Sequence, residues 1–221
     1  MRTEQKPLKS GFGAKTTARE VLAGRDLTGR IAMVTGGYSG VGLETTRALA
    51  EAGATVIVPA RTQEKARTAL ASIPRVELET LELINPASID AFAGRFLSSG
   101  RPLDILINNA GIMAPPLRRD ARGYESQFAT NHLGHFQLTV RLWPALKRAG
   151  STRIVSVFPP GSASGASILT TRILNGGNTT SGKPTGSPRR PTLYSPSRWT
   201  SAVKWMASAP SLYTPAESIL I

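Results

Sequence analysis

The sequence predicts an α/β fold built on a doubly wound parallel sheet. First, short apolar runs rich in β-branched residues alternate with segments of helical periodicity. Second, these runs are continuously apolar, as in strands that are covered on both faces. Third, 221 residues, 40% of them hydrophobic, fit one such domain. The alternation stops at Val157, so we expect the sheet to be incomplete after its fifth strand and to be followed by an irregular C-terminal tail.

The elements follow one another along the chain, each marked by its own pattern. The predicted strands cover residues 31–35, 55–61, 75–83, 103–111 and 153–157. The predicted helices cover residues 40–52, 62–73, 86–100 and a long stretch over 124–150. Thr62 is the expected N-cap of the second helix, and Pro86 suits the first turn of the third. A short helix near the N-terminus is expected to be capped by Thr16 or Thr17, with Glu20 following.

The chain divides into an N-terminal arm over 1–28, an α/β domain over 29–157 and an irregular tail over 158–221. Residues 1–150 carry 20 Lys and Arg and 13 Asp and Glu, whereas residues 151–221 carry 7 and 1. The tail is rich in Ser, Thr, Pro, Gly and Arg and has no helical or alternating apolar period up to residue 200. A linker is the usual interpretation of such a segment, but no pattern of a second domain follows it.

Composition excludes several classes of function. The net charge is +13 and the pI near 11.0, yet no basic stripe with interleaved aromatic residues is present, so a nucleic-acid partner is not expected. The chain has no cysteine, hence no disulfide framework, thiol nucleophile or thiolate metal site. It has no apolar run of membrane-spanning length and does not open with a signal-peptide pattern. We therefore expect a cytoplasmic protein without a membrane span.

The segment Thr35–Gly42, "TGGYSGVG", lies between a predicted strand and a predicted helix. Gly36, Gly40 and Gly42 would let the backbone turn sharply and approach a pyrophosphate at the N-terminus of the helix. The alternative is a tight turn with a purely structural role.

Arg61 follows the second predicted strand, where dinucleotide-binding folds that use NAD place an acidic residue for the ribose diol. A guanidinium at this place suits a 2′-phosphate, which favours NADP(H) over NAD(H). The alternative is an ordinary surface arginine.

Two asparagine motifs complete the pattern: "NNAG" over 108–111, which closes the fourth predicted strand, and Asn131 in "FATNHLGHF". Each alone is unspecific, because Asn-Asn before Gly is a common turn. His132 and His135 are interpreted as packing or surface residues, since two histidines without a third ligand make a poor metal site. No metal site is predicted.

In this order and spacing, the motifs resemble those of the short-chain dehydrogenase/reductase family over roughly residues 10–157. The segment "GYESQFATNHLGHFQLT" is similar to the corresponding segment of the retinol-dehydrogenase-like oxidoreductase branch. The resemblance implies a Rossmann-like dinucleotide-binding domain over 29–157 and hydride transfer between NADP(H) and a small carbonyl or alcohol substrate. It implies Asn131 as a catalytic residue. It implies cofactor contacts at Gly36, Ser39, Gly40, Val41, Gly42, Arg61, Glu82, Leu83, Asn109, Ala110 and Gly111, with Glu82 in place of the family's usual Asp.

The sequence departs from the family after Val157. The family's catalytic Ser belongs two residues further on, where Phe158-Pro159-Pro160 stands, and Tyr-x-x-x-Lys, which supplies the proton, occurs nowhere. The nearest match, Tyr194 to Arg198, contains Pro196, which opposes the required helix. We therefore expect little or no turnover.

One hypothesis explains the tail as the same gene read in a shifted frame. Across codon boundaries, residues 183–189 can encode Ala-Tyr-Gly-Gln-Ser-Lys and residues 157–160 can encode Val-Ser-Ser. The alternative function is a non-catalytic dinucleotide-binding or interaction protein with a basic, disordered tail. The substrate and the oligomeric state, including any homo-oligomer, are left open by the sequence.

Overall fold

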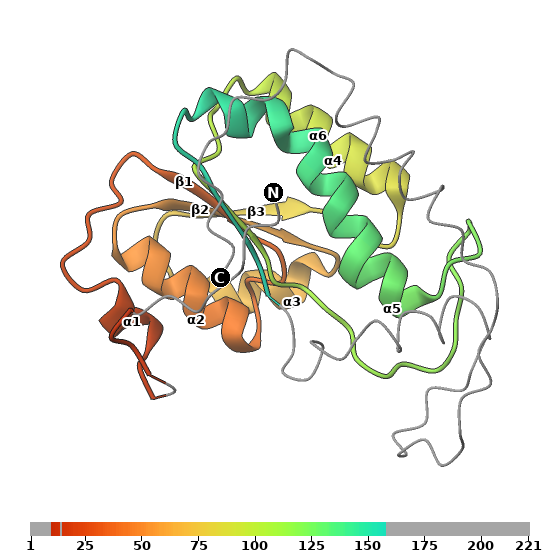
Figure 1. Ribbon diagram of the computed structural model, residues 1–221, viewed down its shortest axis with the longest axis horizontal. Helices are drawn as coiled ribbons and strands as arrows, with labels where there is room; N and C mark the ends of the chain where they lie inside the picture. The colour runs from red at the N-terminus through yellow and green to blue at the C-terminus, as the bar shows by residue number, and fades with distance from the viewer. Residues whose placement is uncertain (1–9, 14, 158–221) are drawn as a thin grey trace, which may run out of the picture. The chain divides into compact units, whose positions relative to one another are not determined.

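The computed structural model describes residues 10–13 and 15–157, which form a five-stranded parallel sheet with helices on both faces (Figure 1). The strand order is β3-β2-β1-β4-β5. The strands are β1 (Ile31–Val34), β2 (Thr55–Ala60), β3 (Val76–Thr80), β4 (Ile105–Asn108) and β5 (Arg153–Ser156). The helices are α1 (Ala18–Val21), α2 (Gly40–Glu51), α3 (Gln63–Leu70), α4 (Pro86–Ser98), α5 (Ser126–Phe128), the π-helix η1 (Ala129–Gly134) and α6 (His135–Arg148).

The predicted α/β class, the parallel sheet and the five strands along the chain are confirmed. The third and fourth strands are shorter than predicted, ending at Thr80 and Asn108. The long predicted helix over 124–150 divides into α5, η1 and α6. The predicted tail over 158–221 lies outside the described residues, as do positions 1–9 and 14 of the arm.

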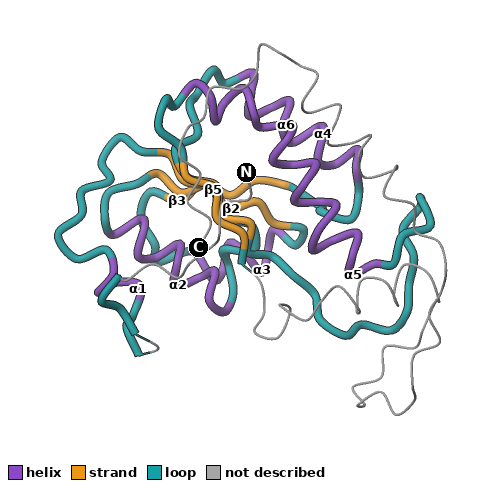
Figure 2. Tube along the Cα trace, in the orientation of Figure 1, coloured by secondary structure: helices purple, strands orange, loops and turns teal. Residues whose placement is uncertain are grey.

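Helices cover both faces of the sheet, with α2 and α3 on one side and α4 and α6 on the other (Figure 2). Because side chains alternate along a strand, neighbouring residues of β1 enter different cores. The core beneath α2 and α3 contains Ala32, Val34, Leu49, Val56, Val58, Ala66 and Leu70. The core beneath α4 and α6 contains Met33, Ile57, Phe92, Leu106, Leu138 and Leu142. These two cores explain why the strands are continuously apolar.

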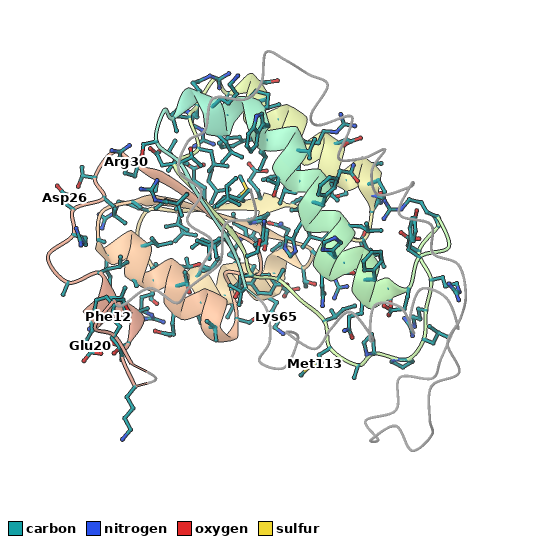
Figure 3. The ribbon with its side chains drawn as sticks, viewed as in Figure 1. Phe12, Glu20, Asp26, Arg30, Lys65 and Met113 are labelled. Carbon is teal, nitrogen blue, oxygen red and sulfur yellow. The ribbon has the colours of Figure 1, made fainter. Side chains whose placement is uncertain are left out.

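Asp104 joins β1 and β4 at their amino-terminal ends. Its carboxylate is 6% exposed and accepts hydrogen bonds from the Ile31 backbone N–H at 2.9 Å and from Arg30 Nη1 at 2.7 Å. Arg30 therefore marks the amino edge of the sheet, whereas Met113, in the loop after β4, marks the opposite edge (Figure 3). The pairing of β1 with β4 is thus fixed at the amino end by the buried Asp104 carboxylate and its two donors.

In the arm, α1 begins with the predicted capping box. The Thr17 hydroxyl accepts from the Glu20 backbone N–H, and the Glu20 carboxylate accepts from the Thr17 backbone N–H at 2.7 Å. Arg19 forms an ion pair with Glu51 of α2 at 2.7 Å. This ion pair connects the described part of the arm to the domain. Within the described part of the chain, no helix combines the length and apolarity that a bilayer crossing would need.

Gly134 lets the π-helical turn before α6 lie directly against the chain that follows β3. A Cβ atom at this position would collide with the Leu83 carbonyl oxygen. Gly94, in the middle of α4, is a matched contrast, because a Cβ there would meet nothing within 4 Å. One glycine is therefore required by packing and the other is not.

We expect the Gly134→Ala and Gly94→Ala substitutions to have opposite effects on stability. Alanine favours a helix over glycine by about 1 kcal/mol, so Gly94→Ala should leave the free energy of unfolding unchanged or raise it slightly. Gly134→Ala should lower it by about 1–3 kcal/mol, because the new methyl group forces α6 away from Leu83. Urea unfolding of the two variants measures the difference. Equal effects would contradict the packing role of Gly134.

Candidate functional site

The candidate site lies at the carboxyl ends of β1 and β4. The chain runs outward from β1 to β2 and β3 and then returns to form β4 on the other side of β1. In open parallel sheets, ligands bind in the crevice at such a switch point. A cleft of about 650 Å³ opens here. Its lining includes Thr35, Gly36, Tyr38, Ser39, Val41, Gly42, Arg61, Glu82, Leu83, Asn109, Ala110, Gly111, Ile112, Arg118, Ser126 and Thr130.

Thr35 connects the turns that follow β1 and β4. Its hydroxyl, in a residue that is 1% exposed, accepts hydrogen bonds from the backbone N–H groups of Asn109 at 2.9 Å and Ala110 at 3.0 Å. In return, Asn109 Nδ2 donates to the Thr35 carbonyl oxygen at 3.0 Å. The backbone beyond Asn108 therefore pairs with a side chain instead of a neighbouring strand, which explains why β4 is shorter than predicted.

Two of the three motif glycines are required by the packing of this turn. Gly36 has φ +66°, and a Cβ there would lie 3.0 Å from the Cα of Ala110. A Cβ at Gly42 would lie 2.5 Å from both Asn109 Nδ2 and the Gly36 carbonyl oxygen. Side chains at either position would separate the first turn of α2 from the end of β4. The packing of the protein itself is therefore sufficient to explain these two glycines.

The first turn of α2 presents unpaired N–H groups. Ser39 is the N-cap, but its side chain makes no capping hydrogen bond, and the N–H groups of Gly40, Val41 and Gly42 have no partner among the described residues. Val41 is 73% exposed. Unpaired N–H groups and the helix dipole make the N-terminus of a helix attractive to an anion. The turn can thus bind a phosphate group by its backbone.

The other side of the cleft is formed by the chain after β2 and β3. Arg61 is exposed, lines the cleft and has no ion-pair partner within the described residues. Glu82 and Leu83 line the cleft beyond β3, where the Glu82 backbone N–H is paired with the Ser88 hydroxyl at 2.9 Å. Arg118 adds a second exposed guanidinium to the lining. The cleft thus offers two cations and one helix N-terminus to a ligand.

Asn131 lies in η1 and holds the loop after β4. Its Oδ1 accepts from the Ile112 backbone N–H at 2.9 Å, and its Nδ2 donates to the Ile112 carbonyl oxygen at 2.9 Å. Both polar ends of the side chain are therefore used within the protein, on the backbone of a cleft residue. Asn131 itself does not appear in the lining described above.

His135 lies between Thr35 and Asn131. Its Nε2 is 2.9 Å from the Thr35 hydroxyl oxygen and its Nδ1 is 2.9 Å from the Asn131 carbonyl oxygen. Burial, which leaves 6% of the residue exposed, lowers the pKa of the imidazole below its ordinary value, although the hydrogen bond to Asn131 acts in the opposite sense. His132, by contrast, is exposed and stacks on Phe128 with ring centroids 5.3 Å apart.

The structure brings together most of the site residues predicted from sequence. Gly36, Ser39, Val41, Gly42, Arg61, Glu82, Leu83, Asn109, Ala110 and Gly111 all line one cleft, whereas Gly40 and Asn131 lie outside its lining. Thr35, His135 and Arg118 were missed. Thr35 could have been found as a lone hydroxyl at the end of an apolar run. Arg118 carries no signal in the sequence, because its place depends on the loop conformation.

The chain matches one family model and is similar to curated proteins. A family model described as short chain dehydrogenase matches residues 30–167. A Streptomyces lividans protein named "Probable oxidoreductase" is 51% identical over 138 residues, which cover 60% of this chain and 46% of that protein. Retinol dehydrogenase 12 of Mus musculus is 39% identical over 137 residues, covering 59% and 43%. The chain therefore spans less than half the length of these two curated relatives.

Solved structures of similar proteins include oxidoreductases with a bound nicotinamide cofactor. Pseudomonas aeruginosa RhlG, in an active-site complex with NADP, is 31% identical with a TM-score of 0.52, covering 59% of this chain and 54% of that one. The 3-ketoacyl-(acyl-carrier-protein) reductase of Brucella melitensis, complexed with NADH, is 26% identical with a TM-score of 0.55, covering 63% and 60%. One of these two similar structures contains NADP and the other contains NADH.

The lowered pKa of His135 gives stability a defined pH dependence. Between its folded-state pKa and about 6.5, the unfolded chain binds the proton that the folded chain excludes, so stability falls as pH decreases, by at most about 1.4 kcal/mol per pH unit. We expect His135→Gln to remove this part of the slope between pH 7.5 and 5.5, as measured by urea unfolding. His132→Gln, which removes the exposed histidine, is the control. An unchanged slope in His135→Gln would contradict the buried neutral imidazole.

Proposed function

The chain belongs to the short-chain dehydrogenase family, and from this premise we propose that its cleft binds NADP(H), the cofactor of hydride transfer between a nicotinamide and a small carbonyl or alcohol substrate. One observation carries the proposal: the unpaired first turn of α2 lies against Asn109 and Ala110 at the switch point of the sheet. A dinucleotide needs an anion site and an adjoining groove at that place.

The residues present fit such a cofactor. The backbone N–H groups of Val41 and Gly42, with the Ser39 hydroxyl, which makes no capping hydrogen bond, would hold the pyrophosphate. Glu82 and Leu83 would adjoin the adenine, and the turn over 109–111 would adjoin the nicotinamide ribose. When bound, the cofactor supplies the redox chemistry, and the protein must supply orientation and a proton.

Arg61 supports NADP(H) over NAD(H). It directly follows β2 and faces the cleft without a partner in the described part of the chain. A guanidinium binds a phosphate through paired N–H groups, whereas a ribose diol is bound by a carboxylate, which this position lacks. The relatives include both NADP and NADH complexes, so the preference rests on this side chain.

We propose further that this chain binds the dinucleotide without appreciable turnover. Proton transfer to a carbonyl oxygen needs a positioned acid whose pKa is tuned toward neutral pH, and none of the four tyrosines is followed four residues later by lysine. Asn131 Oδ1 and Nδ2 each bind the backbone of Ile112. A non-catalytic dinucleotide-binding protein is thus the second candidate function, favoured by this missing acid.

Arg61→Gln should lower the affinity for NADPH about 10- to 100-fold and leave the affinity for NADH nearly unchanged, because only NADPH carries the phosphate that a charge-assisted hydrogen bond recognises. NADPH fluorescence titration measures both constants. Arg67→Gln, an exposed arginine of α3 outside the cleft lining, is the matched control. Equal losses for the two cofactors would remove the basis for an NADP preference, and no binding by the unmodified chain would overturn the proposed function.

The full chain, mixed with NADPH and a panel of small aldehydes and ketones, should show no cofactor oxidation above the buffer rate. Measurable turnover would contradict the proposal that the acid is missing. Sequencing the source gene around codon 157 tests the shifted-frame hypothesis separately. A single-base correction that restores the serine and Tyr-x-x-x-Lys should yield an active reductase.

A further inference from the structure

We propose that His135 is a positioning residue that holds the turn after β4 and the backbone of Asn131 in one fixed arrangement through a single neutral tautomer, protonated on Nδ1. The geometry of this link stands on its own hydrogen bonds. Its consequence for cofactor affinity rests on the proposed function.

The hydroxyl of Thr35 determines the state of one imidazole nitrogen. A hydroxyl group has one hydrogen to donate and two lone pairs that accept. Both lone pairs are used, by the N–H groups of Asn109 and Ala110 at 2.9 and 3.0 Å. The hydroxyl therefore has to act as a donor toward His135, and Nε2, at 2.9 Å, has to be the unprotonated acceptor.

An alternative acceptor for that hydrogen is less suitable. The Ile107 carbonyl oxygen lies 3.4 Å from the Thr35 hydroxyl and already accepts from the Thr35 backbone N–H at 3.1 Å. The contact to His135 is 0.5 Å shorter, within the usual range for a good hydrogen bond. If Nε2 carried a hydrogen, it would point at an oxygen without a free lone pair.

The protonation state of Nε2 determines that of Nδ1. A neutral imidazole carries one N–H group, so with Nε2 unprotonated the hydrogen is on Nδ1. This N–H donates to the Asn131 carbonyl oxygen at 2.9 Å. An imidazolium would present two donors and lose the bond at Thr35, and burial of the ring opposes that charge.

The result is a continuous chain of hydrogen bonds across the bottom of the cleft. It runs from the N–H groups of Asn109 and Ala110 to Thr35, then through His135 to the Asn131 carbonyl oxygen. The Asn131 side chain extends it to the backbone of Ile112. Asn109, Ala110 and Ile112, all at the start of the loop after β4, are thus held by residues that the imidazole joins. His135 therefore positions backbone of the cleft without lining the cleft itself.

The first experiment reads the tautomer directly in the unmodified chain. Long-range ¹H–¹⁵N NMR at pH 7.5 distinguishes protonated from unprotonated ring nitrogens, and the chain has only two histidines, so His132→Gln assigns the signals. We expect His135 to show a protonated Nδ1 and an unprotonated Nε2. A protonated Nε2, or exchange between tautomers, would overturn the inference, whether or not the chain binds NADPH.

The second experiment tests positioning with conservative variants. Asparagine places an N–H near the position of Nδ1, and glutamine places an acceptor near Nε2, so each keeps one end of the link. We expect His135→Phe to weaken NADPH binding about tenfold and to shift the amide signals of Asn109 and Ala110, with partial recovery in His135→Asn and His135→Gln. His132→Gln should leave both readouts unchanged.

The outcomes separate the two proposals. NADPH affinity and amide shifts of His135→Phe equal to those of the unmodified chain would overturn the positioning role. If the unmodified chain does not bind NADPH, the proposed function fails, and the tautomer and the amide shifts of the Asn and Gln variants still decide the inference. The tautomer experiment needs no His135 variant, so a variant that does not fold cannot hide the result.

Discussion

The pair of hydrogen bonds that the Thr35 hydroxyl accepts from Asn109 and Ala110 is the interaction on which the site depends. It brings the turn after β1 and the turn after β4 into contact at the place where the strand order reverses. Two backbone N–H groups that have left the sheet are satisfied by one side-chain oxygen, and without it they would lack this acceptor. The absence of side chains at Gly36 and Gly42 is what permits this distance.

β1 and β4 are therefore joined by side-chain hydrogen bonds at both ends and by parallel backbone pairing between them. Asp104 joins them at the amino edge, where it pairs with the backbone of Ile31 and with Arg30. Thr35 joins them at the carboxyl edge. The core residues between, such as Met33 and Leu106, are fully buried. Strand pairing therefore sets the positions of α2 and of the loop after β4. These positions do not have to be induced by a ligand.

In the proposed function, cofactor binding and turnover depend on different parts of the chain. The anion-binding turn, Arg61 and the loop over 109–112 all lie before residue 157 and form one cleft. A proton donor of the family's kind would come from a later part of the sequence, where the pattern departs from the family. The interactions that hold a cofactor equally well in all states do not by themselves accelerate a reaction. The proposed function therefore has this cleft bind a dinucleotide without the proton transfer that turnover needs.

The sequence by itself determined the class of the fold and the succession of strands and helices along the chain, because periodicity and glycine spacing are local properties. The family resemblance of its motifs indicated ten of the residues that line the cleft. The sequence could not determine that 124–150 would contain a π-helical turn, that Asn131 would bind the backbone of Ile112, or that His135 would lie beneath the cleft. Those features depend on contacts between residues up to a hundred positions apart. Only the tertiary structure decides such contacts, since packing selects which hydrogen-bond partners a buried polar group can reach.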